Sequence, residues 1–331
     1  MDFQLSDDQR ALRSGMRDLL DAVFDRDRMR AAVERGGTLD RSLWRELGAA
    51  GFFALRLPEE AGGVGLGLPE AVLLFEEAGR ALLPGPLVAT HLAAGLVKGA
   101  AEGEAVVTAV DGDLPVAHLA AADAVLVGAD ALVGEPLRAF VAAARPVRSM
   151  DPLTPLHRVA GRTVPTQAYS GALHYEGALL TAAEQLGSAA RTTETAVQHA
   201  GAREQFGSPI GSFQAVKHLC ADMLARTEPA RAAVYAAAVT GDPVEIAAAK
   251  LLADEAAVRN ARDCLQIHGG MGFTWEADVH LHLKRAWLRS AAGLGGAAAE
   301  ELLAAGLGAA RPDPGSSAAP GRGAPEAGGG G

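Results

Sequence analysis

The sequence contains little of what marks an exported or membrane-spanning protein. Only two of its 331 residues are cysteines, Cys220 and Cys264, and each lies in a stretch with helical periodicity. We therefore expect two small buried thiols rather than a disulfide. The N-terminus is acidic and no apolar run follows it, unlike a signal peptide. The longest apolar stretch, 86–97, is too short to cross a bilayer, so we expect a soluble cytoplasmic protein that does not enter a membrane.

Aromatic and basic residues are also scarce. Aromatic residues make up 5% of the chain, whereas hydrophobic residues, many of them alanine, make up 49%. This mixture favours close-packed helices over a sandwich of aromatic-rich strands. The 30 basic residues are outnumbered by 40 acidic ones, and the net charge of −10 is atypical of a nucleic-acid-binding protein. A local cluster of donors would still suffice to bind a ligand that carries phosphate.

Hydrophobic periodicity divides the chain into three ordered parts and a tail. Residues 1–103 have helical spacing, which predicts an N-terminal helical domain. Residues 104–175 hold short β-branched runs split by Gly, Asp and Pro, which predict a compact β domain. Four long helical patterns over 176–308 predict a four-helix bundle. The tail 309–331 should be disordered, and the predicted fold class is mainly α with a small β domain.

Within these parts, individual elements have their own signals. Ser6, followed by two aspartates and Gln9, is typical of a helix start, and Pro69 opens a later helix. Glu76 and Glu77 in that later helix are expected on a solvated face. The run 123–141 is expected to form strands with tight turns.

Three glycine-rich segments are candidate binding motifs. The first, 62–67, does not match the dinucleotide pattern G-x-G-x-x-G and is interpreted as a turn between helices. The second, REQFGSPIGSFQ over 203–214, places Arg203, a forked cation suited to phosphate, at the end of a long helix. The alternative is a capped interhelical turn with a surface arginine. The third, QIHGGMGF over 266–273, ends a helix in Gly-Gly, which is either a C-cap or an open surface for a ligand.

The second and third segments together resemble the two C-terminal signatures of acyl-CoA dehydrogenases. The likeness extends through AAAKLLADEAA, back to AAEQLGSAARTTETAVQHAGA, and to the N-terminal LPEEAGGVGLGLPEAVLLFEEAGRALLPGP. It covers about residues 1–95 and 176–290. It implies helical N- and C-terminal domains around a β domain, and an assembly of two or four family subunits.

The resemblance also implies a role for individual residues in binding FAD. Arg203 would reach the pyrophosphate, Gln205 and Phe206 would line the nucleotide, and Gln214 would face it from the next helix. Gln266, Gly269 and Gly270 would pack on the adenosine end of a neighbouring subunit's cofactor. No metal is implied, because His280 and His282 lack metal-ligand spacing on a helix.

The catalytic base is where the sequence departs from the family. Family members oxidise the α,β-bond of an acyl-CoA thioester, and a glutamate takes the α-proton. At the family spacing this chain has Gly293, and Glu300 and Glu301 come later, where a solvated helix face is expected. Some members place the base at the start of the first bundle helix, where Glu176 is the favoured candidate and Glu184 the runner-up. Both acids also suit ordinary helix-start or surface roles.

The middle domain departs further, because 104–175 contains neither the Thr-Glu-Pro-x-x-Gly-Ser-like loop nor the Trp-x-Thr-type strand that face the flavin ring in the family. Three hypotheses follow. The leading one is an FAD-dependent acyl-CoA dehydrogenase that passes electrons to an electron-transfer flavoprotein. The second is a non-catalytic subunit that shares one FAD site with a fuller family member. The third is an acyl-CoA-binding scaffold without flavin.

Overall fold

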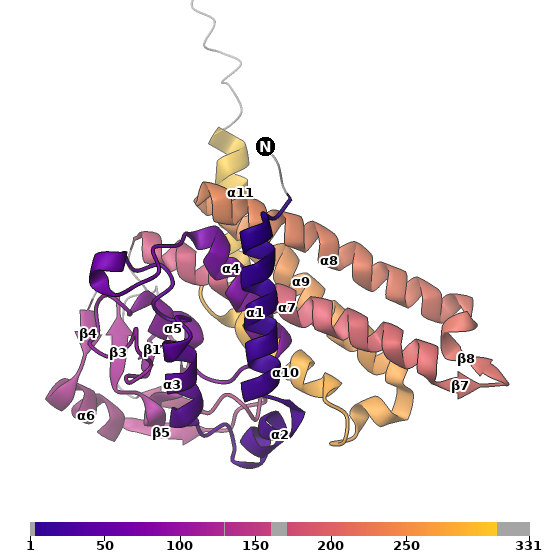
Figure 1. The fold of residues 1–331 in the computed structure, drawn as a ribbon, viewed down its shortest axis with the longest axis horizontal. Helices are drawn as coiled ribbons and strands as arrows, with labels where there is room; N and C mark the ends of the chain where they lie inside the picture. The colour runs from indigo at the N-terminus through magenta and orange to yellow at the C-terminus, as the bar shows by residue number, and fades with distance from the viewer. Residues whose placement is uncertain (1–3, 129, 160–170, 310–331) are drawn as a thin grey trace, which may run out of the picture.

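The computed structural model describes residues 4–128, 130–159 and 171–309. The predicted class is confirmed, because helices come first, short strands follow and long helices end the chain (Figure 1). The N-terminal helices are α1 (Asp7–Val23), α2 (Arg26–Glu34), α3 (Arg41–Ala49), α4 (Leu68–Arg80) and α5 (Leu87–Leu92). Apart from Ala309, the tail expected to be disordered lies outside the described residues. No described helix is both long and apolar enough to span a membrane.

The first helix begins where the sequence predicts. Ser6 Oγ accepts a hydrogen bond from the Gln9 N–H, and Gln9 Oε1 accepts one from the Ser6 N–H, both at 3.1 Å. This reciprocal pair satisfies two donors that a helix N-terminus otherwise leaves free. The helix then buries Met16 and Leu20, which belong to the main core.

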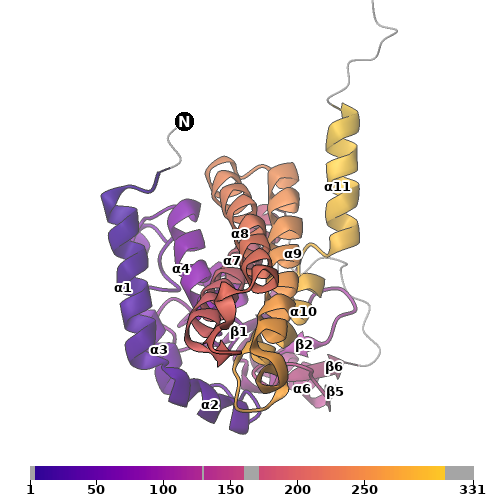
Figure 2. The ribbon, with the colours of Figure 1, turned by 90° about the vertical axis from the view of Figure 1, so that its right-hand side faces the viewer.

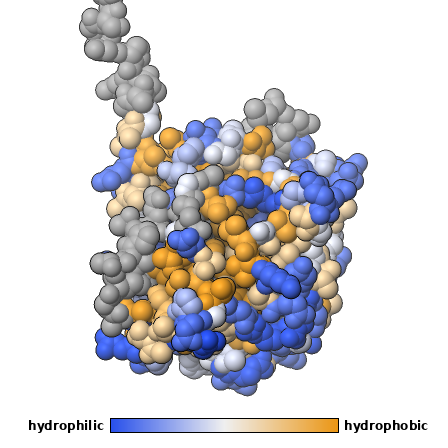
Figure 3. All heavy atoms as spheres, turned by 90° about the vertical axis from the view of Figure 1, so that its left-hand side faces the viewer, coloured by the Kyte–Doolittle hydropathy of each residue, from blue (hydrophilic) through white to orange (hydrophobic). Residues whose placement is uncertain are grey.

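The β segment forms two small sheets. One has the order β1 (Val107–Ala109), β3 (Ala124–Val127), β4 (Asp130–Leu132), with β1 and β3 parallel. The other is antiparallel, in the order β2 (Val116–Ala117), β6 (Leu156–Val159), β5 (Ala144–Val147). Figure 3 shows apolar residues gathered on the face that carries these strands, with hydrophilic residues below them and to their right. Four large apolar side chains of this segment are at least a third exposed, namely Leu114, Val133, Val141 and Met150.

One expectation for the β segment is wrong. Part of the run expected to form strands is a helix, α6 (Gly134–Ala142). Leu137 and Phe140 lie three residues apart and pack together against the small core under the sheet. That three-residue spacing belongs to a helix rather than to a strand, and Glu135 and Pro136 suit a first helical turn.

The four predicted bundle helices are present. They are α7 (Ala172–Ala202), α8 (Gln214–Thr240), α9 (Pro243–His268) and α10 (Val279–Ala291), and α7, α8 and α9 run side by side (Figure 1). A further helix, α11 (Gly296–Ala309), packs against α9 on one side of the bundle (Figure 2). Both cysteines are free, with Cys264 buried and Cys220 half-buried.

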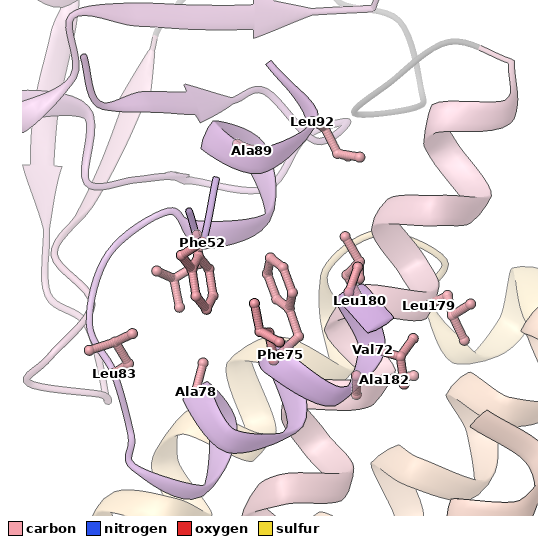
Figure 4. Close-up of a cluster of buried hydrophobic side chains, with 14 of the residues drawn as sticks. Phe52, Val72, Phe75, Ala78, Leu83, Ala89, Leu92, Leu179, Leu180 and Ala182 are labelled. Carbon is pink, nitrogen blue, oxygen red and sulfur yellow. The ribbon is translucent and has the colours of Figure 1, made fainter. Parts of the chain in front are cut away.

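The N-terminal helices and the bundle share one core. Phe75 of α4 lies between Phe52 and Leu180 of α7 (Figure 4), and the two phenyl rings are 5.0 Å apart. Glycine lets α4 and α7 approach closely. A Cβ at Gly79 would lie 2.0 Å from the Glu184 carbonyl oxygen, and one at Gly187 would lie 1.8 Å from that of Glu76.

This close packing also overturns the expectation for Glu76 and Glu77. Instead of facing solvent, their residues are only 4% and 1% exposed, because α1, α7 and α8 all pack against α4. Glu77 accepts two hydrogen bonds from Arg17, and Glu76 pairs with Arg231 and Tyr235. The glutamates therefore connect α4 to its neighbours.

Candidate functional site

The segment after α7 forms a tight hairpin that presents Arg203. Arg203 follows the last helical residue in an extended conformation, and its N–H donates to the His199 carbonyl at 2.8 Å. Strands β7 (Glu204–Gln205) and β8 (Ser208–Pro209) pair across Phe206 and Gly207, whose φ angles are 53° and 76°. Two consecutive positive φ angles are typical of a two-residue hairpin turn. Phe206 at its tip is 94% exposed.

The Gly-Gly turn lies at the end of α9. Gly269 has φ 60° and ψ −141°, which favours glycine, and the short helix η4 (Gly269–Phe273) follows. A Cβ built on Gly269 or Gly270 would meet no atom within 4 Å. The backbone here is therefore open to the approach of another group.

The hairpin and the Gly-Gly turn line the same cavity, of about 810 Å³. Arg203, Gln205, Gly269 and Gly270 all contribute to its wall. The structure thus brings together four of the seven residues that the resemblance assigns to FAD. The other three, Phe206, Gln214 and Gln266, are exposed and lie outside the lining. Both motifs therefore line one cavity of one chain.

Charge in this cavity suits a pyrophosphate. Two of its arginines are engaged, Arg26 with Asp278 at 2.5 Å and Arg191 with Glu194 at 3.8 Å. Among the described residues, Arg203 has no carboxylate partner. A free guanidinium beside an open glycine backbone matches the donor set that a dinucleotide phosphate needs. The residues present therefore fit the nucleotide part of FAD.

Two histidines that the sequence motifs did not single out also line this cavity. The imidazole rings of His199 and His268 stack with centroids 4.0 Å apart and an interplanar angle of 19°. His268 lies inside the Gly-Gly motif, and His199 lies one helical turn before Arg203. The four-residue spacing between His199 and Arg203 is the sequence signal that points to His199.

A second cavity, of about 230 Å³, surrounds the position where the family base is expected. Its wall comes from α5, the β1–β2 connection, α7 and α10, and it includes Gly293. Two carboxylates line it, Asp111 and Glu184. Asp111 Oδ2 accepts a hydrogen bond from the Gly293 N–H at 2.6 Å. The sequence analysis did not name Asp111, because it lies 182 residues from Gly293.

Each candidate base has a partner. Glu176 accepts two hydrogen bonds from Arg56, at 2.6 and 3.2 Å, and does not line the second cavity. Glu184 is buried and pairs with Arg289 at 2.5 Å. Burial raises the pKa of Glu184 and lowers the pKa of Arg289 to about 10. Burial also raises the pKa of Asp111, against a smaller opposing effect of the Gly293 N–H.

Comparison with known proteins agrees with this architecture. The family model "Acyl-CoA dehydrogenase, C-terminal domain" matches residues 168–299, and "Acyl-CoA dehydrogenase, N-terminal domain" matches 6–102. Acyl-CoA dehydrogenase IpdE2 of Mycobacterium tuberculosis is 39% identical over 78% of this chain and 84% of its own length. The IpdE2 of Mycolicibacterium smegmatis is 37% identical over 85% of this chain and 93% of its own length.

Among solved structures, a chain of the ChsE4-ChsE5 complex from Mycobacterium tuberculosis superposes with a TM-score of 0.80 and 25% identity. The match covers 95% of this chain and 100% of that one. The signatures, the fold and the relatives agree, and this chain belongs to the acyl-CoA dehydrogenase family.

Proposed function

We propose that this chain is one subunit of a heteromeric FAD-dependent acyl-CoA dehydrogenase. In this assembly it holds the nucleotide end of the flavin, and a second family member supplies the flavin-ring wall and the base. The reaction is the α,β-dehydrogenation of an acyl-CoA thioester, with an electron-transfer flavoprotein as electron acceptor. The observation that carries the proposal is an asymmetry between the two cavities. In the cavity of about 810 Å³, here called the nucleotide cavity, Arg203 has no carboxylate partner among the described residues, whereas each candidate base has a partner.

The nucleotide cavity supports the first half of the proposal. Arg203 lacks an ion-pair partner in the described part of the chain and can pair with the pyrophosphate through two parallel N–H donors. Gly269 and Gly270 leave room for the adenosine end, because no side chain covers them. These features also argue against the flavin-free scaffold, for which a free arginine beside bare glycines would have no use.

The second cavity supports the other half. FAD, when bound, supplies the hydride acceptor, and the protein must supply a carboxylate that can take a proton. Gly293 has no side chain for this task, and its N–H is occupied by Asp111. Glu184 is held by Arg289, and Glu176 is held by Arg56 away from the cavity. A carboxylate from a partner subunit would supply the missing base.

Exposed aromatic side chains near the nucleotide cavity favour a partner subunit. Phe206, Phe273 and Trp275 are 94%, 76% and 62% exposed, and Met271 of the cavity wall is also exposed. Exposed apolar residues gathered beside a binding site mark protein interfaces. The likeness to a chain of the ChsE4-ChsE5 complex, which is named for two proteins, agrees with a second subunit.

The second candidate is a dehydrogenase that is active by itself. It is favoured by Asp111 and Glu184, which line a largely apolar cavity at the expected substrate position. In that case one of these acids, or Glu176 after the Arg56 contact breaks, would take the α-proton. The two candidates differ in whether the isolated chain carries flavin and turns over acyl-CoA.

The test is flavin content measured with and without a partner. The chain is purified alone and after co-expression with a full-length family member from the same host, and released flavin is quantified by fluorescence. We expect little FAD in the isolated chain and about one FAD per heterodimer. Full flavin loading with turnover of acyl-CoA by the isolated chain would reject the shared site and favour the second candidate.

The same measurement tests Arg203. In the heteromer, Arg203→Ala should reduce retained FAD about tenfold or more, because a charge-assisted bidentate contact is lost. Arg259→Ala is the matched control, since Arg259 is an exposed arginine on α9 that pairs with Glu255 outside the cavity. Equal flavin content in the two variants would remove Arg203 from the FAD site.

A further inference from the structure

The stacked imidazoles of His199 and His268 are a feature that the proposed function does not use. They come from the last turns of α7 and α9, and both rings line the nucleotide cavity. His268 Nδ1 lies 2.8 Å from the Cys264 carbonyl oxygen, so Nδ1 carries the hydrogen and donates it. Nε2 of His268 is then left to accept a hydrogen bond when the ring is neutral and to donate one when the ring is charged.

The two imidazoles and the guanidinium of Arg203 lie close together in the nucleotide cavity. Arg203 follows His199 by four residues, so the two side chains lie on the same side of the helix end. Burial, then His268, then Arg203 lower the pKa of His199. A proton on His199 is therefore unfavourable in the free protein, because it would sit beside a second imidazole and a guanidinium.

The other charged groups of the cavity do not supply a counter-charge. Asp278 is shared between Arg26 and Arg30, and Arg191 pairs with Glu194. His282 is buried on Ser188, and its pKa is lowered to about 3, so it stays neutral. Glu276 is the remaining carboxylate of the lining, and it is exposed. An anion between Arg203 and the two histidines would be the missing partner.

We infer that His199 and His268 are phosphate-binding residues, and that binding of a dinucleotide pyrophosphate places a proton from solvent on His199. The inference rests on the proposed function, since it concerns the same cavity. The pyrophosphate carries two negative charges and offsets the repulsion that opposes a proton on His199. Because one proton is taken up with the ligand, the affinity for the pyrophosphate increases as the pH falls. It decreases as the pH rises through the range in which His199 of the complex loses its proton.

The probe for the test is ADP-ribose, titrated into the full chain by calorimetry at about pH 6 and about pH 8. ADP-ribose contains the adenosine and pyrophosphate of FAD, and its pyrophosphate lacks the phosphate-monoester ionisation near pH 6 that would obscure the result. We expect binding to be about fivefold to tenfold tighter at the lower pH. Titrations in two buffers with different ionisation heats should report uptake of up to about one proton.

Adenosine and variants complete the design. Adenosine, which has no phosphate, should show no pH dependence. His199→Gln should abolish the pH dependence of ADP-ribose binding, and His268→Gln should weaken it, because one source of the repulsion on His199 is removed. His218→Gln, which changes an exposed histidine of α8 outside the cavity, should preserve it. Circular dichroism of each variant reports whether the chain is folded.

The outcomes separate this inference from the proposed function. ADP-ribose binding that is independent of pH, or that keeps its full pH dependence in His199→Gln, overturns the inference and leaves the shared flavin site intact. Absence of ADP-ribose binding at either pH also overturns it. If the heteromer in addition carries no FAD, the proposed function fails as well.

Discussion

The carboxylate of Asp111 accepts a hydrogen bond from the backbone N–H of Gly293 at 2.6 Å, which joins the β1–β2 connection to the turn between α10 and α11. Gly293 stands at the expected position of the family base, and its φ of 68° is one that glycine adopts without strain. The Asp111 carboxylate thus lies against the backbone of the residue at which the family base is expected. The same contact ties the small β segment to the bundle.

This contact predicts opposite effects for two substitutions of Asp111. Asp111→Asn keeps an acceptor for the Gly293 N–H and removes a charge whose burial raises the pKa of the carboxyl. Because a raised folded-state pKa lowers stability as the pH increases, the Asn variant should unfold at the same or a higher urea concentration at neutral pH. Asp111→Ala should lose about 1–3 kcal/mol, because the Gly293 N–H loses its partner. Equal destabilisation of both variants would contradict the assigned hydrogen bond.

The buried pair of Glu184 and Arg289 predicts a rescue. The pKa shifts of both residues favour their neutral forms, because the desolvation penalty of burial exceeds the attraction between the two charges. Glu184→Ala should therefore destabilise the protein by about 3–5 kcal/mol, because it leaves the guanidinium buried without a partner. The double variant Glu184→Leu with Arg289→Met should recover most of that loss in urea denaturation. No recovery would mean that the pair itself is stabilising.

Activity of the heteromer then separates the roles of the candidate acids. Under the shared-site proposal, Glu176→Gln and the Glu184/Arg289 double variant should both retain flavin and most of the turnover of acyl-CoA. Glu176→Gln should cost no more than about 1 kcal/mol, because Gln can still accept a hydrogen bond from the half-buried Arg56. Loss of turnover with flavin retained, in either variant, would identify that acid as the base of this chain.

The close approach of α4 and α7 predicts different outcomes for two Gly→Ala substitutions in one helix. Gly187→Ala would place a Cβ 1.8 Å from the Glu76 carbonyl oxygen and force the helices apart, with an expected loss of about 3 kcal/mol. Gly201→Ala, also in α7, meets nothing within 4 Å. It should gain up to about 1 kcal/mol from helix propensity. Urea denaturation checks both, and equal effects would argue against the observed packing of α4 on α7.

Buried histidines predict how stability depends on pH. Burial lowers the pKa of His91 to about 4 and those of His118 and His282 to about 3. As the pH falls through about 6.5, these histidines take up protons in the unfolded chain but not in the folded chain. The free energy of unfolding is therefore highest above that pH and decreases below it. Each site should remove about 1.4 kcal/mol per pH unit. The free energy of unfolding of His282→Gln should fall less steeply between pH 6.5 and about 4.5, and an unchanged slope would show that His282 does not contribute.

Local signals in the sequence were enough for most of the fold. The Ser6–Gln9 cap, the bundle helices and the glycine turn depend on residues within about four positions of one another, and such interactions can be recognised from spacing. The misassigned segment, α6, is short, and its apolar residues also occur in strands. Its helical spacing extends over only Leu137 and Phe140, and the packing of these two residues against the sheet selects the helix.

The sequence by itself also determined the family, through its two C-terminal signatures. It further predicts that Gly293 stands near the position of the family base. Tertiary structure alone decided which charges are buried and paired, since Glu76 meets Arg231 across 155 residues and Glu184 meets Arg289 across 105. It also decided that the Arg203 and Gly-Gly motifs line one cavity, with His199 stacked on His268. The physical reason is that desolvation and pairing of a charge depend on neighbours brought together by packing, which spacing along the chain does not encode.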